Sequence, residues 1–151
     1  MVFWIGLHIL AATLWVGGMM FVHLALRPTL TEVLEPPQRL AVWLGVLNRF
    51  FPRVWWSILL LHVSGMWVLL GVMGGMAQAR LHVHLMLGIA WVMTGIFAYL
   101  YFGPFQKLRT AVAQQDWPTG GAQMGRLRTW VTTNLVLGTL VMVIGATGRY
   151  W

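Results

Sequence analysis

Histidine is the residue type in this chain of 151 amino acids that is best suited to bind a metal ion. Neutral imidazole is the commonest metal ligand in proteins. The chain has five histidines, all within or beside long apolar segments: His8, His23, His62, His82 and His84. It has no cysteine, which excludes thiolate metal sites, iron–sulfur clusters and disulfides. The three acidic residues lie between the apolar segments, which argues against a carboxylate proton relay: Glu32, Glu35 and Asp116.

Four apolar segments must position these histidines. They cover residues 2–26, 54–72, 81–102 and 130–146. A helix that rises 1.5 Å per residue needs roughly 20 residues to cross a 30 Å hydrocarbon core. Only 9% of the residues are charged, whereas soluble domains have about 25%, and the mean hydropathy is +0.74. The sequence therefore predicts an all-α integral membrane protein, a single domain that forms a four-helix bundle in the lipid bilayer.

The basic residues predict the orientation of the bundle. Eight of the ten lie in the two long connections: Arg27, Arg39, Arg49, Arg53, Lys107, Arg109, Arg126 and Arg128. By the positive-inside rule both connections face the cytoplasm, and both termini face the periplasm of a bacterial inner membrane. This placement also explains the net charge of +7 without a nucleic-acid partner. The first connection has apolar residues at helical spacing over 40–51, which predicts a short interfacial helix. The second has a turn-rich stretch over 116–121.

Depth and direction select among the histidines. His8 lies about 9 Å, and His84 about 6 Å, below the outer ends of their helices. His62 is deeper, at roughly 16 Å, and is a reserve candidate. His82 and His84 are two positions apart and point about 200° away from each other. We expect His84 to face the bundle centre because it shares a stripe with Gly88, Trp91 and Gly95, and small residues line helix contacts.

Two level imidazoles on neighbouring helices are typical of a b-type haem site. The sequence thus predicts that His8 and His84 hold the iron near the periplasmic surface. Gly88 would leave room for the porphyrin, and the haem propionates would meet Arg80. Trp15 and Trp91 would pack against the ring. The expected function is electron transfer, as an oxidoreductase component that works with quinol or a periplasmic redox protein.

Two alternatives remain open. One is copper handling, because thioether and imidazole groups suit Cu(I) and several lie together at the outer side: Met73, Met76, His82 and His84. The other is a structural subunit of a larger membrane complex or a homo-oligomer. The chain also has ten tryptophans. Five of them fall near predicted membrane interfaces, where an aromatic belt is expected: Trp4, Trp55, Trp56, Trp130 and Trp151.

The segment Leu7-His8-Ile9-Leu10-Ala11-Ala12-Thr13-Leu14-Trp15-Val16-Gly17-Gly18 resembles the first helix of CopD-type copper-resistance membrane proteins. It also resembles the related four-helix HemJ-type protoporphyrinogen oxidases. The resemblance continues through Arg27, residues 52–65 and Leu81-His82-Val83-His84-Leu85. It implies a small membrane protein that binds haem b or handles copper, with His8 at the haem-associated position. Because His84 stands where the HemJ pattern has lysine, we do not expect protoporphyrinogen oxidase activity.

Overall fold

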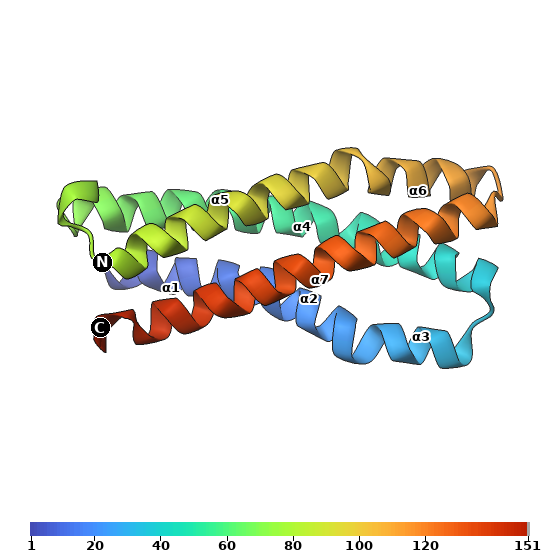
Figure 1. Ribbon diagram of the computed structural model, residues 1–151, viewed down its shortest axis with the longest axis horizontal. Coiled ribbons are helices and arrows are strands. Elements are labelled where there is room, and N and C mark those ends of the chain that lie inside the picture. The colour runs from blue at the N-terminus through green and yellow to red at the C-terminus, as the bar shows by residue number, and fades with distance from the viewer. Residues whose placement is uncertain (151) are drawn as a thin grey trace.

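The computed structural model describes residues 1–150, apart from the side chain of Arg149. It is 91% helical, and the described residues contain no strand. These residues form four long helical rods, 2–33, 36–71, 81–113 and 117–147, each long and apolar enough to cross a membrane. The prediction of an all-α, four-span bundle is therefore confirmed, and the rods are longer than the apolar segments that predicted them (Figure 1).

The first rod contains two π-helical segments. It consists of α1 (Val2–Ala12), the π-helix η1 (Thr13–Gly17), α2 (Gly18–Phe21), the π-helix η2 (Val22–Leu26) and α3 (Arg27–Val33). The other elements are α4 (Pro36–Gly71), the 3-10 turn η3 (Met76–Gln78), α5 (Leu81–Phe102), α6 (Pro104–Ala113), α7 (Trp117–Thr147) and the 3-10 turn η4 (Gly148–Tyr150).

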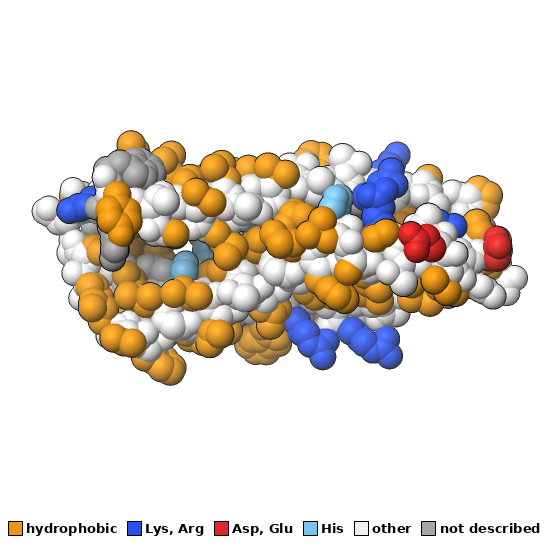
Figure 2. Space-filling view, turned by 90° about the horizontal axis from the view of Figure 1, so that it is seen from below, with side chains coloured by type: hydrophobic (Ala, Val, Ile, Leu, Met, Phe, Trp, Pro, Cys, Tyr) orange, Lys and Arg blue, Asp and Glu red, His pale blue; other side chains and the backbone are white. Residues whose placement is uncertain are grey.

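Both chain ends lie at the same end of the bundle, beside the turn between α4 and α5 (Figure 1). We call this the termini end. The opposite end, with the connections from α3 to α4 and from α6 to α7, is the loop end. Figure 2 shows that most of the visible Lys and Arg side chains and the visible acidic side chains lie toward one end of the molecule. This asymmetry agrees with the predicted orientation, which remains a prediction.

The predicted short interfacial helix is wrong, because its residues belong to α4, a single helix of 36 residues. Pro52 lies inside α4 without ending it. An internal proline costs a helix about 3 kcal/mol, but burial of the adjacent apolar face repays more than one such loss. That face includes Trp43, Leu47 and Phe51, of which no more than 5% is exposed.

The stretch predicted as a turn over 116–121 is mostly helix, since α7 begins at Trp117. Asp116 caps this helix, and its carboxylate accepts a hydrogen bond of 3.1 Å from the backbone N–H of Thr119. Hydrogen bonds from Thr119 hold the pKa of the Asp116 carboxyl below its usual value. The reversal of the chain is confined to the residues before the cap, where Gln115 has a φ of 56°.

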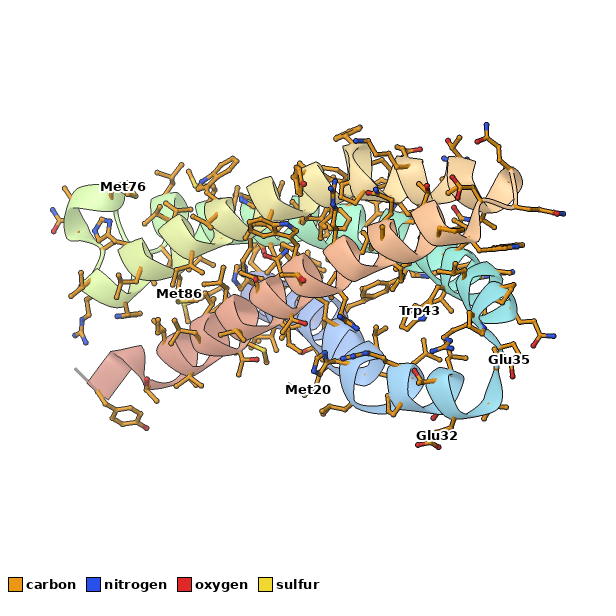
Figure 3. The ribbon with its side chains drawn as sticks, turned by 45° about the vertical axis from the view of Figure 1, so that its right-hand side comes forward. Met20, Glu32, Glu35, Trp43, Met76 and Met86 are labelled. Carbon is orange, nitrogen blue, oxygen red and sulfur yellow. The ribbon has the colours of Figure 1, made fainter. Side chains whose placement is uncertain are left out.

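Large side chains of α5 fill glycine positions on α7. A Cβ at Gly138 would lie 3.1 Å from the Met93 methyl group and 2.7 Å from a methyl group of Val16. A Cβ at Gly145 would lie 3.0 Å from the methyl group of Met86, which Figure 3 shows between the two helices. These contacts fix the rotation of α5 about its own axis, because only one face can enter the glycine positions.

Several apolar residues of the loop end are almost completely buried. Leu108 is 0%, Leu127 1% and Phe105 2% exposed. They come from α6 and α7 and pack in one core cluster with α4. At 1.5 Å per residue α4 is about 54 Å long, well above the roughly 30 Å of a hydrocarbon core. Part of the bundle must therefore extend beyond the hydrocarbon.

Candidate functional site

His8 lies between α1 and α4, in the half of the bundle near the termini. Its Nδ1 atom is 2.9 Å from the hydroxyl oxygen of Ser64, a residue with 0% exposure. The Ser64 hydroxyl has one hydrogen, and the carbonyl groups of Leu60 and Leu61 in its own helix are both within its reach. With the hydrogen on one of these carbonyls, the hydroxyl oxygen accepts the hydrogen of His8 Nδ1. In the neutral ring this leaves the lone pair on His8 Nε2.

Gly65 makes room for this imidazole. A Cβ at Gly65 would lie 3.2 Å from His8 Cε1, which is closer than most side-chain contacts allow. Ser64 and Gly65 thus form the contact surface for His8 on α4, with one polar group and no bulky side chain. The sequence analysis does not identify Ser64 and Gly65 as neighbours of His8. The depth of Ser64 could have indicated the contact, because Ser64 lies seven residues before the end of α4 and so about level with His8.

His62, two residues before Ser64 on α4, also has a hydrogen-bond partner for its Nδ1 atom. Its Nδ1 atom is 2.8 Å from the carbonyl oxygen of Ile58, and a carbonyl can only accept, so Nδ1 carries the hydrogen. The Nε2 atom is buried and has no hydrogen-bond partner among the described residues. The Trp91 ring packs edge-on against the imidazole, with centroids 4.5 Å apart. His8 and His62 are near enough for their charged forms to interact electrostatically.

The predicted inward orientation of His84 is wrong. His84 and Gly88 are exposed, and 60% of Trp91 is exposed. No described atom outside the local helix backbone lies within 4 Å of a Cβ built at Gly88, so this glycine makes no room for a neighbour. The opposite stripe faces the bundle instead, and His82 packs against Gly148. The reason is the packing of α5 against α7. Met93 and Met86 of α5 lie at Gly138 and Gly145 of α7, so the face of α5 that carries these methionines turns toward the bundle.

The remaining predicted residues do not gather around one site. Arg80 is exposed at the N-cap of α5, at the termini end. Trp15 is only 2% exposed and packs edge-on against Phe97, with centroids 6.2 Å apart. It lines a different cavity, in the half near the loop end. Trp15 and Trp91 therefore do not flank a common ligand position within the chain.

The four residues predicted for copper at the outer side all lie near the termini end. Met73, Met76 and His84 are exposed, and His82 is half-buried. Figure 3 shows Met76 on the turn between α4 and α5, far from the loop end. The described residues include no group of three or more His, Asp or Glu side chains that could hold a metal ion. Any metal here would be held by fewer histidines or with help from thioethers.

A cavity of about 390 Å³ occupies the half of the bundle near the loop end. It lies between the first rod, α4 and α7, and His23 lines it. Asn134, 1% exposed, also lines it and donates a hydrogen bond of 3.1 Å from Nδ2 to the carbonyl of Met93. Among the described residues Asn134 Oδ1 has no partner. The lining of this cavity does not include His8, Ser64 or Gly65.

One protein family matches this chain. The model of the family described as copper resistance protein D, CopD, matches residues 44–147, more than half of the chain. The matched part includes His62, Ser64 and His84 and begins after His8. No curated protein and no solved structure matches the chain. The match gives no support to haem binding, and the similarity to HemJ-type oxidases remains a prediction. This multi-pass membrane protein belongs to the copper resistance protein D family, a bacterial membrane family.

Proposed function

We propose that this protein handles copper as its cargo, and that His8 and His62 are the ligands within the membrane. The observation that carries the proposal is the state of the two imidazoles. Each has Nδ1 within hydrogen-bond distance of an oxygen on α4, 2.9 Å for His8 and 2.8 Å for His62. With Nδ1 as the donor, each ring keeps its lone pair on Nε2. A ligating histidine typically donates its other ring N–H in this way, which fixes the ring and raises its basicity.

The chemistry of the neighbouring residues also favours Cu(I). Thioether and imidazole groups are ligands that Cu(I) accepts, and Met73, Met76 and His84 are exposed at the termini end. We propose that these residues capture the ion at the surface, before it reaches His62 and His8. A metal bond would offset the cost of burying unpaired imidazole nitrogen in an apolar environment.

Family membership favours copper over haem. The family is described by copper resistance, whereas a haem held by His8 and His84 of one chain requires His84 to face inward. His84 is exposed, so this arrangement has no support. Electron transfer with quinol or a periplasmic redox protein is correspondingly the weaker proposal.

The test is Cu(I) binding to the purified full-length protein under reducing conditions, measured by competition with a chromophoric Cu(I) chelator. We expect His8→Ala and His62→Ala each to weaken Cu(I) binding by at least about tenfold, since even residues that only orient a ligand contribute tenfold or more. His23→Ala is the matched control, because His23 lies in the other half of the bundle and should bind Cu(I) as the unmodified protein does.

Two results would contradict the proposal. One is Cu(I) binding that is unchanged in the His8→Ala, His62→Ala double variant. The other is a Soret band in the unmodified protein that is lost in His8→Ala, together with absence of Cu(I) binding. The second result would restore haem as the ligand of His8.

A further inference from the structure

The cavity near the loop end has apolar walls and a cationic rim. Its apolar wall includes Trp43, Phe50 and Phe97, and Figure 3 shows Trp43 on α4 at the side that faces α3. Figure 1 shows α3 diverging from α7 toward the loop end. The cavity reaches the surface between them, because exposed Thr31 and Gly121 also line it. An elongated apolar molecule could therefore enter from the side.

Three arginines line the cavity from three different elements: Arg27, Arg39 and Arg128. Within the described part of the chain, no aspartate or glutamate lines it. The Nε atom of Arg39 is buried and has no hydrogen-bond partner in the same part of the chain. Two other arginines of α4 behave differently, since Arg49 and Arg53 donate to carbonyl groups of their own helix. The cavity thus collects positive charge without supplying an internal counterion.

We propose that this cavity binds an anionic phospholipid, with the phosphate at the three arginines and an acyl chain along the apolar wall. A guanidinium donates two parallel hydrogen bonds to phosphate, and the buried Nε of Arg39 offers one of the donors. Partly buried charge is costly unless an opposite charge compensates it. A small soluble anion would satisfy the arginines but would leave the aromatic wall without an apolar partner.

The predicted orientation supports the same ligand. If the basic loops face the cytoplasm, this cavity opens at the leaflet in which anionic lipids are concentrated. The three arginines span α3, α4 and α7, so a bound phosphate would connect elements that diverge at this point. The lipid would then act as a structural link between the first rod and the rest of the bundle.

The test is native mass spectrometry of the purified full-length protein, titrated with phosphatidylglycerol or phosphatidylcholine of identical acyl chains. We expect one phosphatidylglycerol to bind about tenfold more tightly than phosphatidylcholine, because each basic group near an anionic headgroup contributes appreciably to binding. The triple variant Arg27→Gln, Arg39→Gln, Arg128→Gln should lose this preference. The matched control is Lys107→Gln, Arg109→Gln, Arg126→Gln, which removes the same charge from exposed positions outside the cavity.

A second variant keeps all three arginines and fills part of the cavity with a side chain. Gly125 lines the cavity, and no described atom outside the local helix backbone lies within 4 Å of a Cβ at this position. Gly125→Leu should therefore fold and should weaken phosphatidylglycerol binding although all three arginines remain. Equal affinity for the two lipids in the unmodified protein would overturn the proposal. So would full competition by inorganic phosphate, or phosphatidylglycerol binding that neither the triple variant nor Gly125→Leu changes.

Discussion

The two halves of this bundle hold their polar groups in opposite ways. Near the termini end, the imidazoles of His8 and His62, the ligands that we propose for copper, each lie within hydrogen-bond distance of an oxygen on α4. Near the loop end, Arg27, Arg39 and Arg128 are permanent cations around an apolar cavity. The first half offers lone pairs and suits a cation, whereas the second offers donors and suits an anion. The comparison shows that one small bundle places imidazoles in one half and guanidinium groups in the other, and our two proposals assign ligands of opposite charge to these halves.

The strongest way to break this comparison is to test which side of the membrane each half faces. We expect a reporter fused after Trp151 to be periplasmic and a reporter inserted between Gln114 and Asp116 to be cytoplasmic, an all-or-none difference. The measurement is the activity of paired reporters that are active on only one side. A cytoplasmic C-terminus would place the half that we propose for copper on the wrong side for capture from the periplasm.

Packing provides the next largest expected effect. Gly138→Leu should destabilise the bundle by about 3 kcal/mol, because overpacking typically costs 1–3 kcal/mol and the side chain would meet Val16 and Met93 at once. Thermal unfolding in detergent would measure the loss. Gly121→Leu is the matched control, since no described atom outside its local helix backbone lies within 4 Å of a Cβ at Gly121. Equal stability of the two variants would show that the close contact of α5 and α7 is not needed.

A smaller effect should come from Ser64, whose hydroxyl oxygen lies 2.9 Å from Nδ1 of His8, the ligand that we propose. Ser64→Ala should weaken Cu(I) binding by about tenfold, because loss of a partner that orients a metal ligand costs about 10–100-fold in affinity. Ser57→Ala is a suitable control, since the Ser57 hydroxyl donates to the carbonyl of Arg53 in its own helix rather than contacting His8. Chelator competition gives both affinities. A Ser64→Ala variant with unchanged affinity would remove Ser64 from the site.

The smallest expected effect concerns Asp116 at the exposed start of α7. Its carboxyl pKa is lowered by the hydrogen bonds from Thr119. The ionised cap therefore contributes stability above the carboxyl's ordinary pKa, and this contribution is lost as the pH falls through the lowered value. Asp116→Ala should slightly lower the Tm at neutral pH, and the difference should shrink in acid. A difference in Tm that does not depend on pH would argue against a charged cap.

The sequence was sufficient to predict the spans, because length and hydropathy decide them, but not the rotation of α5. In water the apolar face of a helix is the buried face, whereas in lipid both faces are apolar and the pattern loses its meaning. Gly88 lies on the exposed face of α5, and the decisive glycines, Gly138 and Gly145, are on α7. Which helix supplies the glycines and which the side chains depends on pairing, and α5 alone does not contain that information.

The site could be predicted only in part. The sequence singles out His8 as a ligand candidate and His62 as a reserve, because histidines within membrane helices are expensive to bury and so are usually functional. Their hydrogen-bond partners were not, since Ser64 and the Ile58 carbonyl become relevant only when the helices are placed. Similarly, the arginines of the loop end were recognised as a topology signal. Their convergence on one cavity follows from the divergence of α3, which no local pattern indicates.

The great length of α4 has a thermal consequence. One helix of 36 residues is longer than the hydrocarbon core is thick. One part of it therefore packs in lipid and another part packs outside the hydrocarbon. If the loop end is the part outside the hydrocarbon, the packing around Leu108 depends on exclusion of water, a driving force that weakens on cooling. Around Gly138 it depends on close van der Waals contact between helices in lipid, which has no such dependence. We therefore expect cold, and urea in the same way, to loosen the bundle from the loop end while the membrane-embedded half stays assembled.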